Sequence, residues 1–400
     1  MNPIAAPLSS ADTALPAHPT AAWQVTASQP VQFSVRIAHG LLELENPLLA
    51  QQCGCTRHTP QRRLVVVDRN VDTLYGEALR RYFDHWRIQA TWQVLEIDES
   101  HKNLEQALLI VHAMDRLGLL RRHEMVVAIG GGVLTDLVGF ACSLYRRGVP
   151  YLRVPTTLMG QIDAGIGIKT GVNQGGHKNR LGSYFAPAGV LIDPGFLASL
   201  SQRHINNGLA EIIKMALIDD AGLFHALESA VGHLPPRAWA TPGGPLAQIM
   251  ERAISGMLAQ LTPNLWEQEL ARSVDFGHTF SPALELHAKP MLLHGEAVAV
   301  DMALSLGLAT RRGYLSQAEG ARALQLIERC GLPTQNPVFN ATLLQRALAQ
   351  AVQHRDGQQR VPLPGPLGHC VFVNDLRPQE LTGALDWVAL QRSSNERQRA

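Results

Sequence analysis

Hydrophobic and polar positions follow two patterns along the first half of the chain. Short β-branched or alternating runs are typical of strands, and longer stretches with helical spacing of apolar residues are typical of helices. The two kinds alternate along the sequence, which predicts an α/β fold with a doubly wound parallel sheet over about residues 30–195. The predicted strands are 64–68 (LVVVD), 91–97 and 125–129 (MVVAI), and the predicted helices are 71–87, 104–120 and 134–145.

From about residue 199 the pattern changes to helices with few strand signals. We therefore expect a flexible N-terminal tail over 1–28, an α/β domain over 29–198 and a mainly helical domain over 199–400. The predicted helices of the second half are 205–218, 222–230, 246–261, 278–286, 295–311, 318–330 and 341–354, and its best strand candidate is 370–373.

Composition excludes two classes of partner. Lys+Arg 35 balance Asp+Glu 34, and the formal charge of +1 offers no basic surface for nucleic acid or for an anionic membrane. No apolar run reaches the length of a membrane span, and the mean hydropathy is −0.02. Residues 1–23 lack the basic and apolar regions of a signal peptide, so we expect a cytoplasmic protein.

The five cysteines give one short motif. Cys53 and Cys55 form a C-x-C pair with His58 close by, a spacing that allows a metal clip. We favour the simpler interpretation, two reduced cysteines in a surface segment of a cytosolic protein.

Three consecutive glycines, 130–132, directly follow the predicted strand 125–129 and precede a helix. Glycines at this place let a phosphate approach the free N–H groups of a helix N-terminus. The spacing is not G-x-G-x-x-G, so a tight strand-to-helix turn without a ligand stays open. Asp136 lies in the first turn of this helix, where it would serve as a cap.

The segment 154–180 (VPTTLMGQIDAGIGIKTGVNQGGHKNR) is dense in glycines, hydroxyls and polar side chains between two apolar strands. A polar loop inside a compact domain is usually functional, so we expect a binding loop here in preference to a purely structural one. Its basic and amide side chains are suited to a phosphate, with Asp163 as the carboxylate among them. These side chains are Lys169, Lys178, Asn179 and Arg180.

One glutamate and two histidines form the third constellation. Glu211 shares a helix face with Lys214, and His278 and His294 each lie at the predicted start of a helix. A His₂Glu set is typical of an open catalytic zinc site, although no H-E-x-x-H spacing supports it here. Two helix-capping histidines and a surface glutamate are the alternative.

Taken together, these segments resemble the sugar phosphate cyclases, the family of 3-dehydroquinate synthase. The matching stretches follow one another in order over about residues 60–310. The resemblance implies a Rossmann-like NAD-binding domain followed by a helical metal-binding domain. The stretches are AIGGGVLTDLVGF, YRRGVPYLRVPTTLMGQIDAGIGIKTGVN, GHKNRLGSYFAP, NGLAEIIKMALI, DFGHTFSPALE and LLHGEAVAVDMAL.

The resemblance also implies a role for individual residues. Glu211, His278 and His294 match the ligands of a divalent metal, zinc or cobalt. Arg147 matches an arginine that reaches the substrate phosphate of a neighbouring subunit, which implies a homodimer. The positions that match NAD contacts are Asp68, Glu99, Lys102, Gly131, Gly132, Asp136, Thr156 and Thr157, with Lys169 and Lys178 bordering both cofactor and substrate. The positions that match substrate-binding residues of the catalytic pocket are Asp163, Lys169, Asn179 and Lys214, and we also expect Lys178 to hold the phosphate and Asp275 to take part in substrate binding and catalysis.

The chain departs from dehydroquinate synthase before the first metal histidine. Leu261 and Ala271 stand at or near the positions of a lysine and an arginine that hold a substrate carboxylate in that enzyme. A buried carboxylate without a cationic partner is costly, so we expect this pocket not to select an acid. Asp275, in place of the usual asparagine, suits the hydroxyl-rich end of a neutral sugar.

Leu261, Asp275 and His354 resemble the residues that mark the 2-epi-5-epi-valiolone synthases within the family. This resemblance implies conversion of sedoheptulose 7-phosphate to a cyclitol ketone with release of phosphate, through transient oxidation by NAD, β-elimination, re-reduction and aldol closure. The alternatives are a 2-epi-valiolone or desmethyl-4-deoxygadusol synthase, 3-dehydroquinate synthase itself, a metal-dependent polyol dehydrogenase, and a non-catalytic NAD-binding protein.

Overall fold

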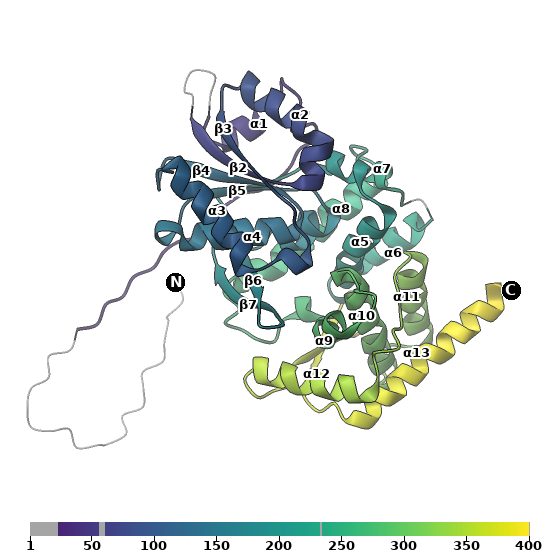
Figure 1. Ribbon diagram of the computed structural model, residues 1–400. Coiled ribbons are helices and arrows are strands. Elements are labelled where there is room, and N and C mark those ends of the chain that lie inside the picture. Colours follow the sequence, from purple (N-terminus) through teal and green to yellow (C-terminus); the bar gives the residue numbers. More distant parts are fainter. Residues whose placement is uncertain (1–22, 56–60, 233, 400) are drawn as a thin grey trace, which may run out of the picture. The chain divides into compact units, whose positions relative to one another are not determined.

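A six-stranded parallel sheet forms the centre of the first half of the molecule (Figure 1). The computed structural model describes residues 23–55, 61–232 and 234–399, the last six as backbone only. The strands lie in the order β1-β8-β5-β4-β2-β3. Their bounds are β1 (Val35–Ile37), β2 (Arg62–Asp68), β3 (Gln89–Leu95), β4 (Met125–Gly130), β5 (Tyr151–Pro155) and β8 (Gly189–Ile192).

Helices cover both faces of this sheet. Leu64 and Val66 of β2 pack in a hydrophobic cluster with helices α3 and α4, whereas Val65 and Val67 pack in a second cluster with α1 and α2. Because side chains alternate between the faces of a strand, a strand buried on both faces is apolar throughout, as the LVVVD run predicts. The helices are α1 (Leu48–Gln52), α2 (Arg69–His85), α3 (Leu104–Leu117) and α4 (Gly132–Leu144).

The order of strands reverses between β2 and β4. The chain runs from β2 outward to β3 and then returns to β4 on the other side of β2. Asp68 ends β2 and Gly130 ends β4, so both lie at the carboxyl edge where parallel α/β sheets bind ligands. The N-terminus of α4 is capped by no side chain, and a Cβ added at Gly132 would lie 2.8 Å from the Cβ of Ala164. The glycines therefore allow a close turn as well as an open helix end.

The segment 154–180 is not a loop, which corrects the sequence prediction. It contains a π-helical turn (Gly160–Ala164), strand β6 (Lys169–Gln174) and the first part of β7 (His177–Tyr184), which pair antiparallel as a hairpin. Gly175 and Gly176 form its tip with φ of +59° and +76°, the left-handed conformation that two-residue hairpin turns require. The hairpin places the polar side chains of this segment on a defined ladder.

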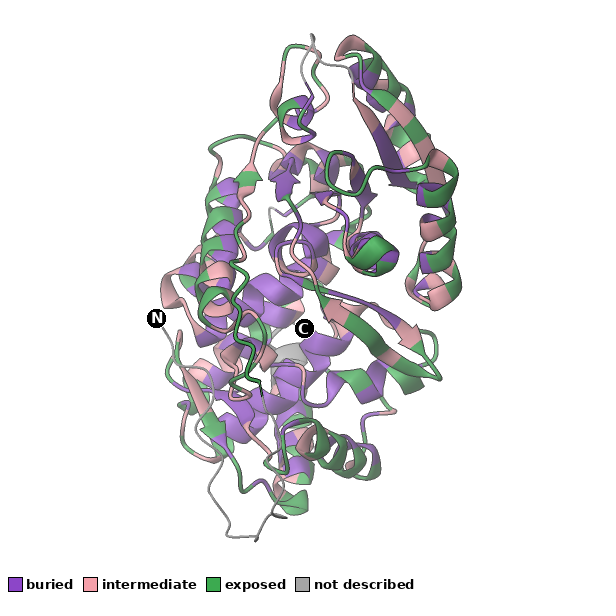
Figure 2. Ribbon diagram, turned by 90° about the vertical axis from the view of Figure 1, so that its left-hand side faces the viewer, coloured by how far each residue is buried: buried purple, intermediate pink, exposed green. Residues whose placement is uncertain are grey.

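The second half is mainly helical, as expected. Helices α5 and α10 are buried along most of their length and belong to the largest hydrophobic cluster. Figure 2 shows buried residues as purple ribbon. The helices are α5 (Gln202–Ile218), α6 (Ala221–Ala230), α7 (Pro236–Trp239), α8 (Pro245–Leu261), α9 (Ser281–His287), α10 (His294–Arg311), α11 (Gln317–Arg329), α12 (Ala341–His354) and α13 (Pro378–Arg399). A hairpin of β9 (Val361–Pro364) and β10 (Cys370–Val373) completes it.

Two expectations for this half need correction. Helix α9 begins at Ser281, so His278 lies in the preceding turn and not at a helix start. Helix α13 follows the last predicted element and was missed. Short 3₁₀ turns connect the other elements at Glu99–His101, Tyr145–Arg147, Pro194–Ser199, Thr262–Asn264 and Ser273–Asp275.

The elements belong to one compact unit that begins at Gln32. Residues 23–31 have no helix or strand, and the predicted tail up to residue 22 lies outside the described residues. The boundary at 198/199 stays a prediction. No helix of the described chain is long and apolar enough to cross a bilayer.

The C-x-C pair is not a surface segment. Cys53 and Cys55 are both buried, and burial raises the pKa of the Cys53 thiol to about 12. A thiol of this kind is a poor nucleophile and a poor metal ligand at neutral pH. His58 lies outside the described residues.

Candidate active site

Glu211, His278 and His294 meet at one point although they come from separate elements. Glu211 lies on α5, His278 in the turn before α9, and His294 is the first residue of α10. The Nε2 atoms of the two histidines are 3.2 Å apart, and Glu211 Oε1 lies 3.7 Å from one and 3.4 Å from the other. Within the described residues, this trio is the group of His, Cys, Asp or Glu side chains placed to hold a metal ion.

The contacts around this trio fit a divalent metal. His278 Nδ1 lies 3.1 Å from the Phe276 carbonyl and His294 Nδ1 lies 3.2 Å from Glu285 Oε1, so each ring donates outward and leaves Nε2 as a ligand atom. Both carboxylate oxygens of Glu211 are buried and accept no well-directed hydrogen bond. Two imidazole nitrogens and a carboxylate make the open His₂Glu set of a catalytic zinc site.

Charges around the trio balance one another. Lys214 Nζ forms an ion pair with Glu211, and both side chains are almost fully buried. Burial acts to raise the pKa of Glu211, but Lys214 and the two imidazoles outweigh it and hold that pKa below its ordinary value. For His294, burial acts to lower the pKa, but the carboxylates of Glu285 and Glu211 raise it to about 10. A metal ion that binds Nε2 of His294 therefore displaces a proton.

Lys178 on β7 connects the trio to the carboxyl edge of the sheet. Its Nζ forms an ion pair with Glu285, the residue that accepts from His294, and lies 3.3 Å from Glu99 Oε1. Glu99 is in the turn that precedes α3. Burial acts to lower the pKa of Lys178, but the two carboxylates raise it, so the ammonium is retained. One side chain thus spans from the predicted cofactor side to the predicted metal side.

Lys102 makes a second connection between the sheet and the hairpin. Its ammonium donates to Asp136 Oδ2 at 2.7 Å and to Asn179 Oδ1 at 2.6 Å. The hairpin is fixed to the same turn through Asn173, whose N–H donates to the Lys102 carbonyl at 2.7 Å. Asp136 is therefore not a helix cap. It belongs to a buried polar network that joins α4, the turn before α3 and the hairpin.

The remaining predicted NAD positions line the carboxyl edge of β2, β4 and β5. Asp68 caps α2 by accepting from the Asn70 N–H at 2.8 Å, and burial raises the pKa of its carboxyl. Thr156 and Thr157 follow β5, and a Cβ added at Gly131 would lie 3.1 Å from Thr157 Cγ2. The structure therefore brings the predicted set together at the switch point of the sheet, where dinucleotides bind.

Models of the two halves of 3-dehydroquinate synthase match consecutive parts of the chain. The N-terminal model matches residues 92–207 and the C-terminal model matches residues 208–354. The chain belongs to the 3-dehydroquinate synthase family.

Relatives within this family are similar over nearly the whole chain. A 2-epi-5-epi-valiolone synthase of Actinomyces sp is 47% identical over 368 residues, which cover 91% of this chain and 97% of the relative. One of Streptomyces hygroscopicus subsp. jinggangensis is 50% identical over 373 residues, which cover 91% and 89%. The solved structure of ValA, a 2-epi-5-epi-valiolone synthase of Streptomyces hygroscopicus subsp. jinggangensis 5008 with NAD+ and Zn2+ bound, matches with a TM-score of 0.88 and 49% identity over 92% of this chain and 100% of that chain.

Two cations that were not predicted lie near the predicted substrate site. Arg272 and Arg355 lie beside Asp275, at 3.4 Å and 4.0 Å from its carboxylate. Arg272 also pairs with Glu267, which in turn pairs with Lys169. The cations are present, but carboxylates of the chain already compensate them.

The other predicted residues lie as follows. Leu261 is the last residue of α8, and its Cδ1 lies 3.6 Å from where a Cβ added at Gly167 would be. Burial acts to lower the pKa of Lys214, and the charge of Asp163 is among those that raise it. Arg147 is exposed. His354, predicted to bind substrate, is exposed at the end of α12.

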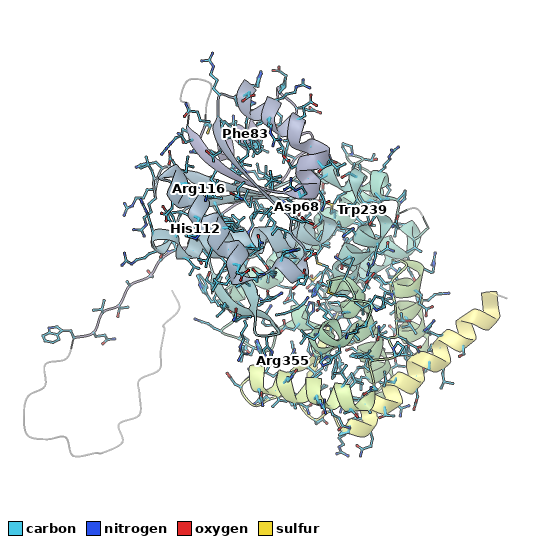
Figure 3. The ribbon with its side chains drawn as sticks, viewed as in Figure 1. Asp68, Phe83, His112, Arg116, Trp239 and Arg355 are labelled. Carbon is cyan, nitrogen blue, oxygen red and sulfur yellow. The ribbon has the colours of Figure 1, made fainter. Side chains whose placement is uncertain are left out.

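Arg355, the residue of this segment that reaches the site, was not predicted from the sequence. Arg355, labelled in Figure 3, is buried. It donates to Oγ1 of Thr279, the residue that follows His278, at 3.3 Å. Glu285 was not predicted either. It lies on α9, seven residues after His278. The signal for Glu285 was an acidic residue on the helix that follows a ligand histidine, a place from which second contacts to metal ligands often come.

Proposed function

We propose that the protein is a 2-epi-5-epi-valiolone synthase, which converts sedoheptulose 7-phosphate to 2-epi-5-epi-valiolone and releases phosphate. The observation that carries the proposal is that Lys178 joins Glu99 on the cofactor side to Glu285 and His294 on the metal side. A dehydrogenation and a β-elimination at neighbouring carbons require that NAD and the metal reach the same substrate molecule. The similarity to synthases of this name over nine-tenths of the chain gives independent support.

Glu211, His278 and His294 would hold the metal, and the carboxyl edge of the sheet would hold NAD. When bound, NAD supplies a reversible hydride acceptor and the metal supplies Lewis-acid polarisation of substrate oxygens. The zinc and NAD+ of the ValA structure support this assignment. The native metal, zinc or cobalt, is to be decided by metal analysis of the purified protein.

The chain's own residues would bind and orient the sugar phosphate. Lys169 is half-exposed and paired with Glu267, which makes it suited to hold a phosphate that must later leave. Lys214 is buried, and carboxylates raise its pKa against the effect of burial, so it offers a fixed ammonium to hydroxyl or carbonyl oxygens. Asp163 and Asp275 supply acceptors for substrate hydroxyls and sites for moving protons.

Substitution of the trio tests the metal assignment. Glu211→Ala, His278→Ala and His294→Ala should each abolish turnover and metal binding while the chain stays folded. His287→Ala is the matched control, because this exposed histidine lies on the adjacent helix outside the trio. Full activity of a metal-stripped triple variant would refute the assignment.

Product analysis tests the reaction. Incubation with sedoheptulose 7-phosphate, NAD and Zn2+ should release phosphate without accumulation of NADH, and NMR should identify 2-epi-5-epi-valiolone. A different stereoisomer would favour a 2-epi-valiolone or desmethyl-4-deoxygadusol synthase. Net formation of NADH would favour a polyol dehydrogenase, and efficient turnover of the dehydroquinate synthase substrate would overturn the specificity argument.

The same proposal includes a homodimer in which Arg147 acts on the neighbouring site. The exposure of Arg147 in a single chain supports it. Arg147→Ala and Glu211→Ala are each expected to be inactive. If the arginine acts between subunits, mixing and reassembling the two variants restores one intact site in each mixed dimer, or about a quarter of the wild-type activity. No recovery in mixed dimers shown to have formed would refute this arrangement.

A further inference from the structure

Asp301 is a fully buried carboxylate on α10 that belongs to none of the sets described above. It lies seven residues after His294 on the same helix. Its Oδ2 accepts from the N–H of Phe280 at 2.5 Å and from the N–H of Ser281 at 2.8 Å. Its Oδ1 faces the Ser305 hydroxyl at 3.3 Å.

The two N–H groups that Asp301 accepts lie at the start of α9. The N-cap residue of this helix is Phe280, which offers no side-chain cap, and Phe280 and Ser281 are both buried. The first N–H groups of a helix have no partner within it, and leaving them unpaired in the interior is costly. Asp301 supplies from a distant element the acceptor that the local sequence lacks.

This contact joins the two segments that carry the histidine ligands. Phe280 is two residues from His278, and α10 begins with His294. The bracing is reciprocal, because Glu285 on α9 accepts from His294 Nδ1. Helix α10 therefore holds the turn of one ligand through Asp301, and α9 holds the other ligand through Glu285.

We propose that Asp301 is a positioning residue of the metal site, which fixes the turn of His278 against α10 and thereby sets the affinity for the divalent ion. Asp301 contacts no ligand atom and no reacting group. Its action is through Phe280 and Ser281. The proposal rests on the metal site of the proposed function and adds to it the residue that sets the distance between its two histidines.

Metal binding and thermal unfolding of the full-length, metal-free protein separate this role from that of an ordinary helix cap. The variants are Asp301→Ala, which removes the acceptor, and Asp301→Asn, which keeps the shape and loses the charge. Asn340→Ala is the matched control, because Asn340 caps α12 by accepting from Leu343 N–H at 3.1 Å and is no part of the metal trio. Zn2+ affinity is measured by competition with a chromophoric chelator, and Co2+ spectra report the ligand geometry.

Removal of an outer contact of a metal site commonly weakens metal affinity by about 10- to 100-fold. For Asp301→Ala we expect at least about tenfold weaker Zn2+ binding and an altered Co2+ spectrum, and for Asp301→Asn a loss of about threefold. Asn340→Ala should lower the unfolding temperature of the metal-free protein without changing either metal readout.

Unchanged Zn2+ affinity and Co2+ spectrum in Asp301→Ala would overturn the proposal and leave Asp301 a cap of α9. If Asp301→Ala does not fold, the same result in Asp301→Asn would overturn it. The metal site itself is checked separately with Glu211→Ala. If wild type and Glu211→Ala bind Zn2+ equally, the proposed function fails at its metal site. If only Glu211→Ala loses Zn2+, an unaffected Asp301 variant refutes the positioning role alone.

Discussion

Lys102→Met is a substitution whose outcome the structure defines closely. The Lys102 side chain is 6% exposed, and its ammonium donates to Asp136 Oδ2 at 2.7 Å and Asn179 Oδ1 at 2.6 Å. Methionine keeps the length and apolar character of the stem but has no charge or donor. The substitution therefore leaves the Asp136 carboxylate without its cation, while the backbone of residue 102 can keep its bond from Asn173.

The expected loss follows from the burial of the pair. Removing one partner of a buried ion pair costs about 3–5 kcal/mol, and the lower end applies because the Asp136 side chain is 17% exposed. We therefore expect a loss of about 3 kcal/mol in the free energy of unfolding. A chain of 400 residues has an unfolding entropy of about 0.8 kcal/mol/K, so the midpoint should fall by about 4 °C.

Thermal unfolding of the metal- and NAD-free protein measures this effect, and a double variant tests its cause. In Lys102→Met/Asp136→Asn no buried carboxylate is left unpaired, so more than half of the lost stability should return. Arg322→Met is the surface control, because its pair with Glu228 is 40% and 23% exposed and should contribute no more than about 1 kcal/mol. A double variant that is less stable than Lys102→Met would refute the reasoning.

Three further predictions concern ligands. Glu285→Gln should weaken Zn2+ binding about tenfold, as measured by chelator competition. If Lys178 acts through Glu285, adding Lys178→Met to Glu285→Gln should weaken Zn2+ binding little further. Because burial raises the pKa of Asp68, NAD affinity should fall as the pH drops below neutral towards that raised pKa, and Asp68→Asn should bind NAD weakly without this pH dependence in the same titrations. Asp275→Asn should lower kcat/KM for sedoheptulose 7-phosphate about tenfold, whereas an unchanged value would remove Asp275 from the substrate site.

The architecture was predictable because burial leaves a direct mark on composition. A parallel strand covered on both faces must be apolar at every position, and the LVVVD and MVVAI runs are β2 and β4. The end of α3 was also encoded locally but was missed, because Gly118 ends the helix in a left-handed conformation after Leu117, whereas the predicted helix ran to residue 120. The hairpin β6–β7 was missed because its strands are polar and glycine-rich, although the Gly175–Gly176 pair is a hairpin signal.

Pairings between distant residues were harder to predict. His354 and Arg355 are neighbours in the sequence, but adjacent positions at a helix end point about 100° apart, and Arg355 is the one that turns inward. Asp301 lies 20 and 21 residues from the N–H groups that it accepts. Spacing along one chain does not encode such contacts, because they depend on how two helices pack.

The arrangement of lysines suggests how the site tolerates the loss of phosphate. The chain has five lysines, and four of them lie in this region, each with a carboxylate partner. A buried cation whose anionic partner departs is strongly destabilised. If lysines of this set hold the substrate phosphate, as proposed, each ammonium keeps a carboxylate of the chain when phosphate leaves, so the release creates no unpaired charge and is not opposed by the full attraction of bare cations. The pairs are Lys102–Asp136, Lys169–Glu267, Lys178–Glu285 and Lys214–Glu211.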